Sequence, residues 1–238
     1  MPERPYVLLS CAASIDGYID DTTDQRLLLS NDEDFDRVDE VRTGCDAILV
    51  GANTIRRDNP RLLVRAEQRR KDRVARGLPE SPIKVTFTSS GDLVPDAKFF
   101  TAGDVQKIVY CSSGAVDSCR DRLGGAATVV SAGDPVDLTT MLADLAGRGV
   151  QRLMVEGGGA VHTQFLTTGL ADELQLVVAP FFVGDAHAPR FVGPGQFPHH
   201  PGNRMALQEV HPIGDVIFAR YRLTNFDGTP SAQPDQAT

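Results

Sequence analysis

The sequence has 238 residues, with 24 Lys or Arg and 32 Asp or Glu, and a formal net charge of −8. An acidic chain of this kind argues against a protein whose main partner is nucleic acid or an anionic membrane. It is long enough to bury a large core as one domain without disulfides.

The sequence contains no targeting or membrane signature. A strand-like segment follows directly after the first five residues, and no apolar run approaches the ~20 residues that span a bilayer. The four cysteines form no CxxC pair and no metal-ligand spacing, which favours reduced thiols and no metal site. These features predict a cytoplasmic protein without membrane contact.

Short apolar runs rich in β-branched residues predict strands along the chain. In order they are Tyr6–Ser10, Ala47–Val50, Ile83–Thr88, Lys107–Tyr110, Thr128–Val130, Arg152–Val155 and Leu174–Ala179. Several are apolar on both faces, as the Ala-Ile-Leu-Val run at 47–50 shows. This pattern is typical of strands buried inside a parallel sheet.

Amphipathic stretches between these runs predict helices. The clearest begins at Ser30, the predicted N-cap, with Glu33 at capping-box spacing, and it ends at Gly44. A second helix is predicted over 137–147, and a third starts within 157–159. Strands and helices that alternate in this way predict βαβ units with right-handed crossovers.

The end of the chain changes character. Met205–His211 and Val216–Leu223 flank a Pro-Ile-Gly-Asp turn and predict an antiparallel hairpin. Residues 227–238 have the composition of a disordered tail, which leaves 1–226 as a single domain. The basic run 65–76 predicts a solvated helical face. The predicted fold class is therefore α/β, with a mostly parallel sheet flanked by helices and a C-terminal antiparallel hairpin.

The most informative motif is Glu156-Gly157-Gly158-Gly159, which lies between a strand and a helical stretch. Glycines let the backbone approach a ligand closely, and the following helix start presents free N–H groups to an anion. The motif is not the GxGxxG fingerprint, so a phosphate cradle and an ordinary tight turn fit it equally. Glu156 is either an acid or substrate contact beside the cradle, or a carboxylate that caps backbone donors.

The segment from Val50 to Leu62 follows another buried strand. Carboxyl ends of parallel strands are where α/β sheets place ligands. Thr54 and Asp58 are four residues apart, so one helical turn puts them on the same face. A simple capped turn explains the local pattern as well.

Other polar positions are less specific. The Ser14–Tyr18 segment is a turn at the end of the first strand. His199 and His200 lie in a Pro- and Gly-rich loop without ligand spacing and predict a surface loop. His162 follows the glycine motif, where it either touches a cofactor or packs.

Taken in order, these motifs resemble the riboflavin-pathway pyrimidine reductases, which occur as the reductase half of a bifunctional deaminase–reductase and as stand-alone archaeal and fungal enzymes. The segments that carry the resemblance are SIDG (14–17), VGANT (50–54), DNPRL (58–62), VEGGG (155–159), GLADEL (169–174) and APFFVG (179–184). The resemblance covers roughly residues 5 to 223.

This resemblance implies a dihydrofolate-reductase-like fold, a homodimer and NADPH as cofactor. The implied reaction reduces a ribosylaminopyrimidine 5′-phosphate to the ribitylamino compound, after the N-glycoside opens to an imine. The protein would position the reactants and stabilise charge, and the cofactor would carry the hydride. The choice between NADPH and NADH stays open, with Arg56 and Arg57 as candidates for a 2′-phosphate contact.

The resemblance also implies site residues. The positions that match cofactor contacts are Ala12, Thr54, Asp58, Ser89, Gly158, Gly159, Ala160, Val161, His162 and Thr163. The positions that match substrate contacts are Arg42, Leu62, Arg65 and Glu156, with Tyr18 next to the SIDG motif. Glu156 is the predicted catalytic residue, which delivers a proton or orients the ribose. Arginine forks suit a sugar phosphate, although Arg42 also serves its helix C-terminus and Arg65 fits ordinary surface charge.

One departure leaves the substrate open. Many family members carry Lys or Arg where this chain has Tyr18, and a phenol cannot replace a permanent cation. Tyr18 therefore favours an alternative, a related reductase of a pterin, a folate or a specialised-metabolite pyrimidine. A third hypothesis is a catalytically silent nucleotide-binding protein, although the cradle, Thr54 and Asp58 are all in place. The zinc-binding signature of the deaminase half is not found in this sequence.

Overall fold

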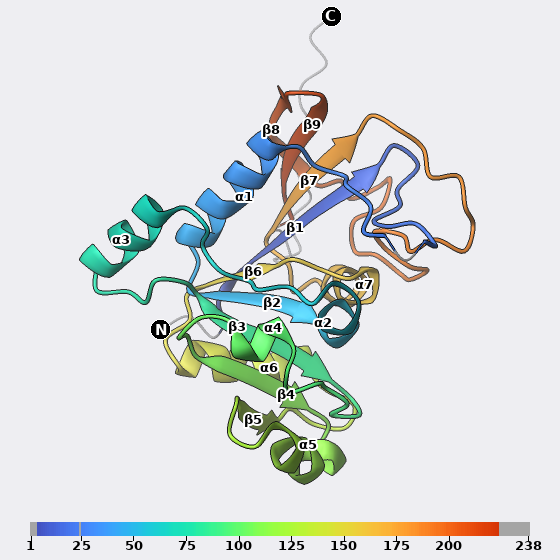
Figure 1. Cartoon of the computed structure of the whole chain (residues 1–238). Helices are drawn as coiled ribbons and strands as arrows, with labels where there is room; N and C mark the ends of the chain where they lie inside the picture. Colours follow the sequence, from blue (N-terminus) through green and yellow to red (C-terminus); the bar gives the residue numbers. More distant parts are fainter. Residues whose placement is uncertain (1–3, 24, 224–238) are drawn as a thin grey trace, which may run out of the picture.

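The computed structural model describes residues 4–23 and 25–223. Within these residues, nine strands form one twisted sheet in the order β5-β4-β3-β2-β6-β1-β7-β9-β8 (Figure 1). The strands are β1 (Tyr6–Ser14), β2 (Ala47–Gly51), β3 (Ile83–Thr88), β4 (Lys107–Cys111), β5 (Thr128–Ser131), β6 (Arg152–Val155), β7 (Glu173–Ala179), β8 (Ala206–Ile213) and β9 (Val216–Arg222).

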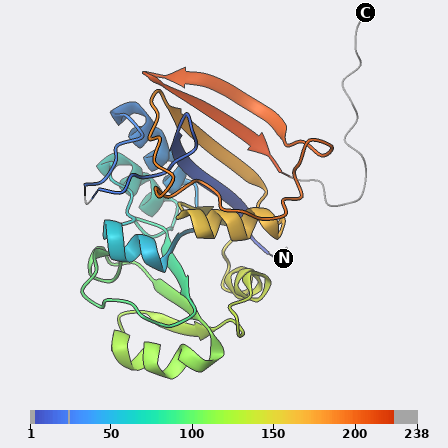
Figure 2. The same ribbon diagram turned by 90° about the vertical axis from the view of Figure 1, so that its right-hand side faces the viewer.

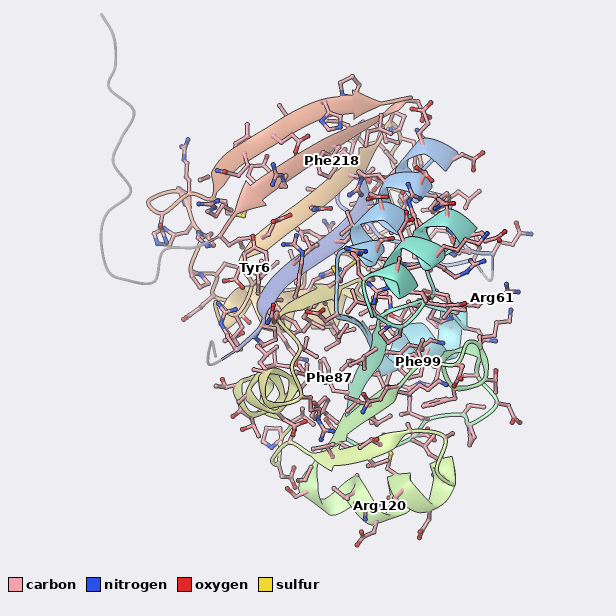
Figure 3. The ribbon with its side chains drawn as sticks, turned by 90° about the vertical axis from the view of Figure 1, so that its left-hand side faces the viewer. Tyr6, Arg61, Phe87, Phe99, Arg120 and Phe218 are labelled. Carbon is pink, nitrogen blue, oxygen red and sulfur yellow. The ribbon has the colours of Figure 1, made fainter. Side chains whose placement is uncertain are left out.

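The sheet is parallel except at one end. Every neighbouring pair from β5 to β7 is parallel, whereas β9 pairs antiparallel with both β7 and β8. Figure 3 shows the length of the sheet, with Phe218 at its antiparallel end and Arg120 on the helix that covers the opposite end. The predicted class, a mostly parallel sheet with a C-terminal antiparallel hairpin, is confirmed.

Helices pack on both faces of this sheet. They are α1 (Asp32–Thr43), α2 (Ala52–Asp58), α3 (Glu67–Ala75), α4 (Lys98–Thr101), α5 (Val116–Leu123), α6 (Leu138–Gly147) and α7 (Gly159–Thr167), with a 3₁₀ turn at Ser113–Ala115. Figure 2 shows α6 and α7, in yellow, on one side of the sheet and α1 and α2, in blue and cyan, on the other. The predicted helices over 137–147 and from 157–159 are confirmed as α6 and α7.

Two apolar cores explain why the central strands are apolar on both faces. In β1, Val7 and Leu9 join the core that contains α6 and α7, whereas Leu8 joins the core of α2, α4 and α5. Successive side chains of a strand point to opposite faces, so a strand covered by helices on both sides needs apolar residues at every position.

The start of α1 differs from the predicted one. Asn31, not Ser30, is the N-cap, and its side-chain oxygen accepts a hydrogen bond from the backbone N–H of Asp34 at 3.0 Å. The Asn31 amide also donates to the carbonyl of Ile213 at 2.7 Å in the turn between β8 and β9. Asparagine caps a helix as well as serine does, and the additional hydrogen bond to Ile213 favours Asn31 as the cap.

The basic run 65–76 forms a mostly exposed helix, α3, as predicted, with Arg73 as its one buried residue. In α3 the guanidinium of Arg73 is only 1% exposed and donates to the carbonyls of Thr43, Cys45 and Pro79. Val74 beside it is exposed instead. The charge pattern therefore predicts the exposed face of this helix but not the burial of Arg73.

The predicted tail at 227–238 and the predicted domain end at 226 lie outside the described residues. Within 4–23 and 25–223, no helix has the length and apolar character needed to cross a membrane.

Candidate functional site

A large cavity lies where the central strands end. Its volume is about 1760 Å³, and its wall includes Gly51 at the end of β2, Ser89 after β3, and Glu156 after β6. Ligands of open α/β sheets bind at such carboxyl ends. The cavity is larger than a typical pocket for one small molecule, so it has room for two ligands side by side.

The three glycines of the glycine motif form a stretch of this wall where the backbone carries no side chains. Gly157 and Gly158 have φ angles of +115° and +77°, a region that favours glycine, and α7 begins at Gly159. A Cβ on Gly158 would lie 3.2 Å from Thr54 Oγ1, and one on Gly157 would lie 3.0 Å from His162 Nε2. A side chain would fill the cradle, so these glycines keep backbone N–H groups open to an anionic ligand such as the diphosphate of a dinucleotide.

Thr54 and Asp58 both line the cavity from α2. Burial raises the pKa of the Asp58 carboxyl above its usual value, although the nearby charge of Arg26 opposes the shift. The helix ends at Asn59, whose φ of +45° is the left-handed conformation that asparagine tolerates.

Glu156 and Arg42 form a tight ion pair in the cavity wall. Arg42 Nε and Nη2 donate to the two Glu156 oxygens at 2.6 Å each, and Nη1 donates to the carbonyl of Leu63 at 3.0 Å. Burial disfavours the charged guanidinium, but the Glu156 carboxylate outweighs burial and raises the pKa of Arg42. Two residues that the sequence offered as separate substrate contacts therefore act as one unit.

Leu62 and Arg65 line the cavity from the segment between α2 and α3. Leu62 is buried, and its φ of +49° is a left-handed conformation that costs a leucine roughly 1 kcal/mol. Arg65 places its guanidinium 5.5 Å from the centre of the Phe35 ring on α1. The strained backbone at Leu62 directs the chain back along the cavity wall.

Tyr18 is the one predicted site residue that does not line the cavity. It is only 4% exposed, and its hydroxyl accepts a hydrogen bond at 2.7 Å from Arg190, which does line the cavity. Sequence reasoning missed Arg190 because it lies in the long segment between β7 and β8, outside every motif. The cation on this side of the cavity comes from Arg190.

His162 packs against the glycine cradle from α7. Burial lowers the pKa of its imidazole to about 4, so the ring is neutral at pH 7, and its Nδ1 has no hydrogen-bond partner among the described residues. His199 Nε2 donates to the carbonyl of Leu223 at 2.9 Å. Within 4–23 and 25–223, no cluster of three or more His, Cys, Asp or Glu residues could hold a metal ion.

The cavity is basic although the whole chain is acidic. Among the described residues, ten cationic and four acidic side chains line it. The cationic ones are Arg26, Arg37, Arg42, Arg56, Arg57, Arg61, Arg65, Arg70, Lys98 and Arg190. The acidic ones are Asp20, Asp34, Asp58 and Glu156. A wall of this composition attracts ligands that carry phosphate groups.

Known proteins resemble this chain over nearly its whole length. The chain is 34% identical over 220 residues to the 2,5-diamino-6-ribosylamino-4(3H)-pyrimidinone 5′-phosphate reductase of Methanothermobacter thermautotrophicus, covering 92% of this chain and 98% of the relative. It is 32% identical over 220 residues to the enzyme of the same name from Archaeoglobus fulgidus, covering 92% of this chain and 99% of the relative.

Solved structures share the fold. RibD of Acinetobacter baumannii (form 1) has a TM-score of 0.76 at 21% identity, covering 94% of this chain and 59% of that one. The riboflavin biosynthesis reductase Rib7 of Saccharomyces cerevisiae has a TM-score of 0.70 at 18% identity, covering 93% of this chain and 91% of that one. The family described as "RibD C-terminal domain" matches residues 5–219. The chain therefore belongs to the RibD C-terminal domain family.

Proposed function

We propose that this protein reduces 2,5-diamino-6-ribosylamino-4(3H)-pyrimidinone 5′-phosphate to its ribitylamino product with NADPH, in riboflavin biosynthesis. The observation that carries the proposal is the convergence of the glycine motif at 156–159 and the 50–62 segment on one basic cavity of about 1760 Å³. The archaeal relatives that bear this reductase name span almost the same length as the chain. A phosphorylated pyrimidine and a dinucleotide both suit such a wall.

The residues of the cavity wall fit NADPH. The bare backbone at Gly157–Gly159, with Thr54, Asp58 and Ser89 beside it, would hold the cofactor. When bound, NADPH supplies the hydride that reduction at the sugar C1′ requires. The chain provides the open backbone for phosphates and a wall that holds the two reactants next to each other.

The geometry favours an orienting role for Glu156 over proton delivery. Both of its oxygens accept hydrogen bonds from Arg42, and each has a further lone pair that can accept one from a ribose hydroxyl. In this arrangement the carboxylate is an acceptor. Arg42 fixes the direction of the carboxylate with two N–H groups and donates a third to the carbonyl of Leu63, so we assign the substrate phosphate to other cations such as Arg65.

The alternative of a pterin or folate reductase loses its main support. That alternative was favoured by Tyr18 as a substrate contact, but the Tyr18 side chain is buried beside Arg190 and does not line the cavity. A neutral residue at position 18 therefore leaves a cation available at the site.

We also propose a homodimer. Leu176 and Val178 of β7 share one face of the sheet with Ile217 of β9 and with Leu207 and Val210 of β8. Ile217, Leu207 and Val210 are each more than half exposed. Apolar side chains that continue across three strands favour a second copy as the cover for this face. Analytical ultracentrifugation tests the proposal, and a monomer at micromolar and higher concentrations would contradict it.

We place the protein in the cytoplasm, because its four cysteines are all free thiols, as a reducing compartment requires. Fractionation of cells that express the chain tests this location.

The decisive experiment follows NADPH oxidation by absorbance with the purified protein. We expect turnover with the diamino-pyrimidinone phosphate, slower or no turnover with the 5-amino-uracil counterpart, and none with a dihydropterin or dihydrofolate. NADPH binding without turnover on any of these compounds would favour a silent nucleotide-binding protein. Turnover restricted to a pterin or a folate would overturn the proposed substrate.

A further inference from the structure

Arg190 and Tyr18 form a closely packed pair at one side of the cavity. The Arg190 guanidinium carbon lies 4.4 Å from the centre of the Tyr18 ring, and Nη2 donates to the Tyr18 hydroxyl at 2.7 Å. The backbones of the two residues also form an antiparallel bridge. Stacking and a hydrogen bond to the same aromatic residue restrict the guanidinium to one orientation.

The loops that carry this pair are fastened together. Both Asp16 carboxylate oxygens accept backbone N–H groups of the opposite loop, from Val183 at 3.1 Å and from Gly184 at 2.8 Å. Ile19 N donates to the carbonyl of Pro189 at 2.9 Å. The position of Arg190 is therefore set by backbone contacts on both sides of it.

The same segment lies against the start of α7. A Cβ on Gly159 would be 2.2 Å from the carbonyl oxygen of Arg190, and the backbone N–H of Gly193 donates to Thr163 Oγ1 at 2.8 Å. Arg190 lines the cavity from this place. The backbone of Arg190 thus lies next to the glycine cradle and the N-terminus of a nine-residue helix, so its positive side chain extends from the edge of the cradle.

The charge of Arg190 is free for a ligand. Its partners among the described residues are the Tyr18 hydroxyl and, at 3.4 Å, the carbonyl of Asp16, both uncharged. Arg42 differs, because Glu156 neutralises it. His162, nearly fully buried beneath Gly157, has an unpartnered Nδ1 and brings no positive charge, because burial lowers the pKa of its ring to about 4.

We propose that Arg190 binds a phosphate group of NADPH at the glycine cradle, and that Tyr18 is the positioning residue that holds Arg190 there. This inference rests on the proposed function, since it takes NADPH as the ligand. Tyr18, the one predicted site residue that does not line the cavity, thereby has a role. Arg190, a loop residue outside every motif, thereby becomes part of the proposed cofactor site.

The test measures NADPH binding by fluorescence titration, without turnover. For Arg190→Gln we expect the Kd to rise about tenfold or more, the loss that follows removal of a charge-assisted hydrogen bond. Tyr18→Phe keeps the stacked ring but removes the hydroxyl, and we expect a rise of ~3-fold. Reduced nicotinamide riboside, which has no phosphate, should bind all three proteins equally.

Arg120→Gln is the matched control. Arg120 lies on α5 at the far end of the sheet (Figure 3), where it pairs with Asp117 at 3.0 Å. The substitution removes the same charge from the chain and should leave the Kd unchanged. The KM for the pyrimidine phosphate at saturating NADPH should also be unchanged in Arg190→Gln.

Three results would overturn the inference while the proposed function stands. The first is an NADPH Kd in Arg190→Gln equal to that of the wild type. The second is a loss of affinity in this variant that is as large for the phosphate-free riboside as for NADPH. The third is a rise in its KM for the pyrimidine phosphate while its NADPH affinity is unchanged. The last would assign Arg190 to the substrate phosphate. If the wild-type protein itself bound no NADPH, the proposed function would fail together with the inference.

Discussion

At the scale of single residues, the Arg42–Glu156 pair is the group with the largest consequence for chemistry. The Arg42 and Glu156 side chains are 15% and 14% exposed, and both Glu156 oxygens are engaged. Removing one partner of such a pair leaves an uncompensated charge, which costs more than the pair contributes when intact. A substitution that tests the role of Glu156 must therefore keep the shape of its side chain and a terminal group that can form hydrogen bonds.

Glu156→Gln meets that requirement. We expect turnover to fall ~10²-fold. The amide has only one acceptor oxygen, so it cannot accept hydrogen bonds from Arg42 and the ribose at both of the positions that the carboxylate oxygens occupy. The NADPH Kd should change less than about threefold, because the proposed cofactor contacts lie on the glycine cradle. Steady-state rates and fluorescence titration measure the two quantities separately.

The matched control is Glu80→Gln, an exposed carboxylate outside the cavity wall. It should leave both quantities unchanged. A tenfold or larger rise of the NADPH Kd in Glu156→Gln would show that this carboxylate belongs to the cofactor site instead.

His162 predicts a pH dependence of stability. Burial lowers the pKa of its imidazole from 6.5 to about 4. Between these two values the unfolded chain binds more protons than the folded one, so the free energy of unfolding decreases as the pH falls through this window. The full effect of one such group is roughly 3 kcal/mol.

Denaturant unfolding of His162→Gln and wild type at several pH values measures this effect. The stability advantage of the wild type over the variant should shrink by that amount between about pH 7 and about pH 4. His187→Gln, in an exposed loop, should follow the wild-type profile at every pH. A constant difference between His162→Gln and wild type would mean that the ring is not desolvated.

At the scale of elements, the central strands and the basic helix α3 were predictable, whereas the four-residue helix α4 was not. Helices cover both faces of β2, so all five of its residues are buried and the apolar run is visible in the sequence. Helix α4 has four residues, and α3 buries only Arg73. A helix of four residues is too short for an amphipathic repeat, and α4 is held by a contact from a distant part of the chain, the hydrogen bond from Lys98 N to Asn59 Oδ1 at 2.6 Å.

The start of α7 gives the sharpest prediction for an element. In Gly159→Ala the new Cβ would lie 2.2 Å from the Arg190 carbonyl oxygen, closer than any such contact allows. The segment 189–193 must move, at a cost of ~2–4 kcal/mol in the free energy of unfolding. NADPH affinity should fall as well, since the movement displaces Arg190.

Gly147→Ala is the control, because a Cβ at this last residue of α6 meets nothing within 4 Å. It should be neutral or stabilise the protein by up to ~1 kcal/mol, as alanine does in helices. Equal unfolding midpoints for Gly159→Ala and wild type would contradict the close packing of this segment on α7.

At the scale of the whole molecule, the motifs located most of the site, and tertiary contacts located the rest. Thr54, Asp58 and Glu156 follow strands that end at one edge of the sheet, so their convergence was predictable. Arg190 has no such marker, because its place depends on Tyr18 and on backbone bonds from the loop after β1. The Arg42–Glu156 pairing was hidden for the same reason, since the two residues are separated by 114 positions.

The distribution of charge over the molecule makes a final prediction. Ten cationic and four acidic side chains line the cavity among the described residues, in a chain whose net charge is −8. The remainder of the molecule is therefore strongly acidic and repels the same phosphates that the cavity attracts. Opposed fields of this kind make ligand binding depend on salt, which screens charges over about 10 Å at 0.1 M.

We expect the NADPH Kd to rise ~3- to 10-fold between about 0.02 M and about 0.5 M salt, because screening weakens the cavity's attraction more than it relieves the distant repulsion. Reduced nicotinamide riboside, without phosphates, should show little change over the same range. Titrations at a series of salt concentrations measure both. A salt-independent NADPH Kd would mean that the cationic side chains of the cavity are neutralised by their carboxylate neighbours, and that the cradle alone holds the cofactor.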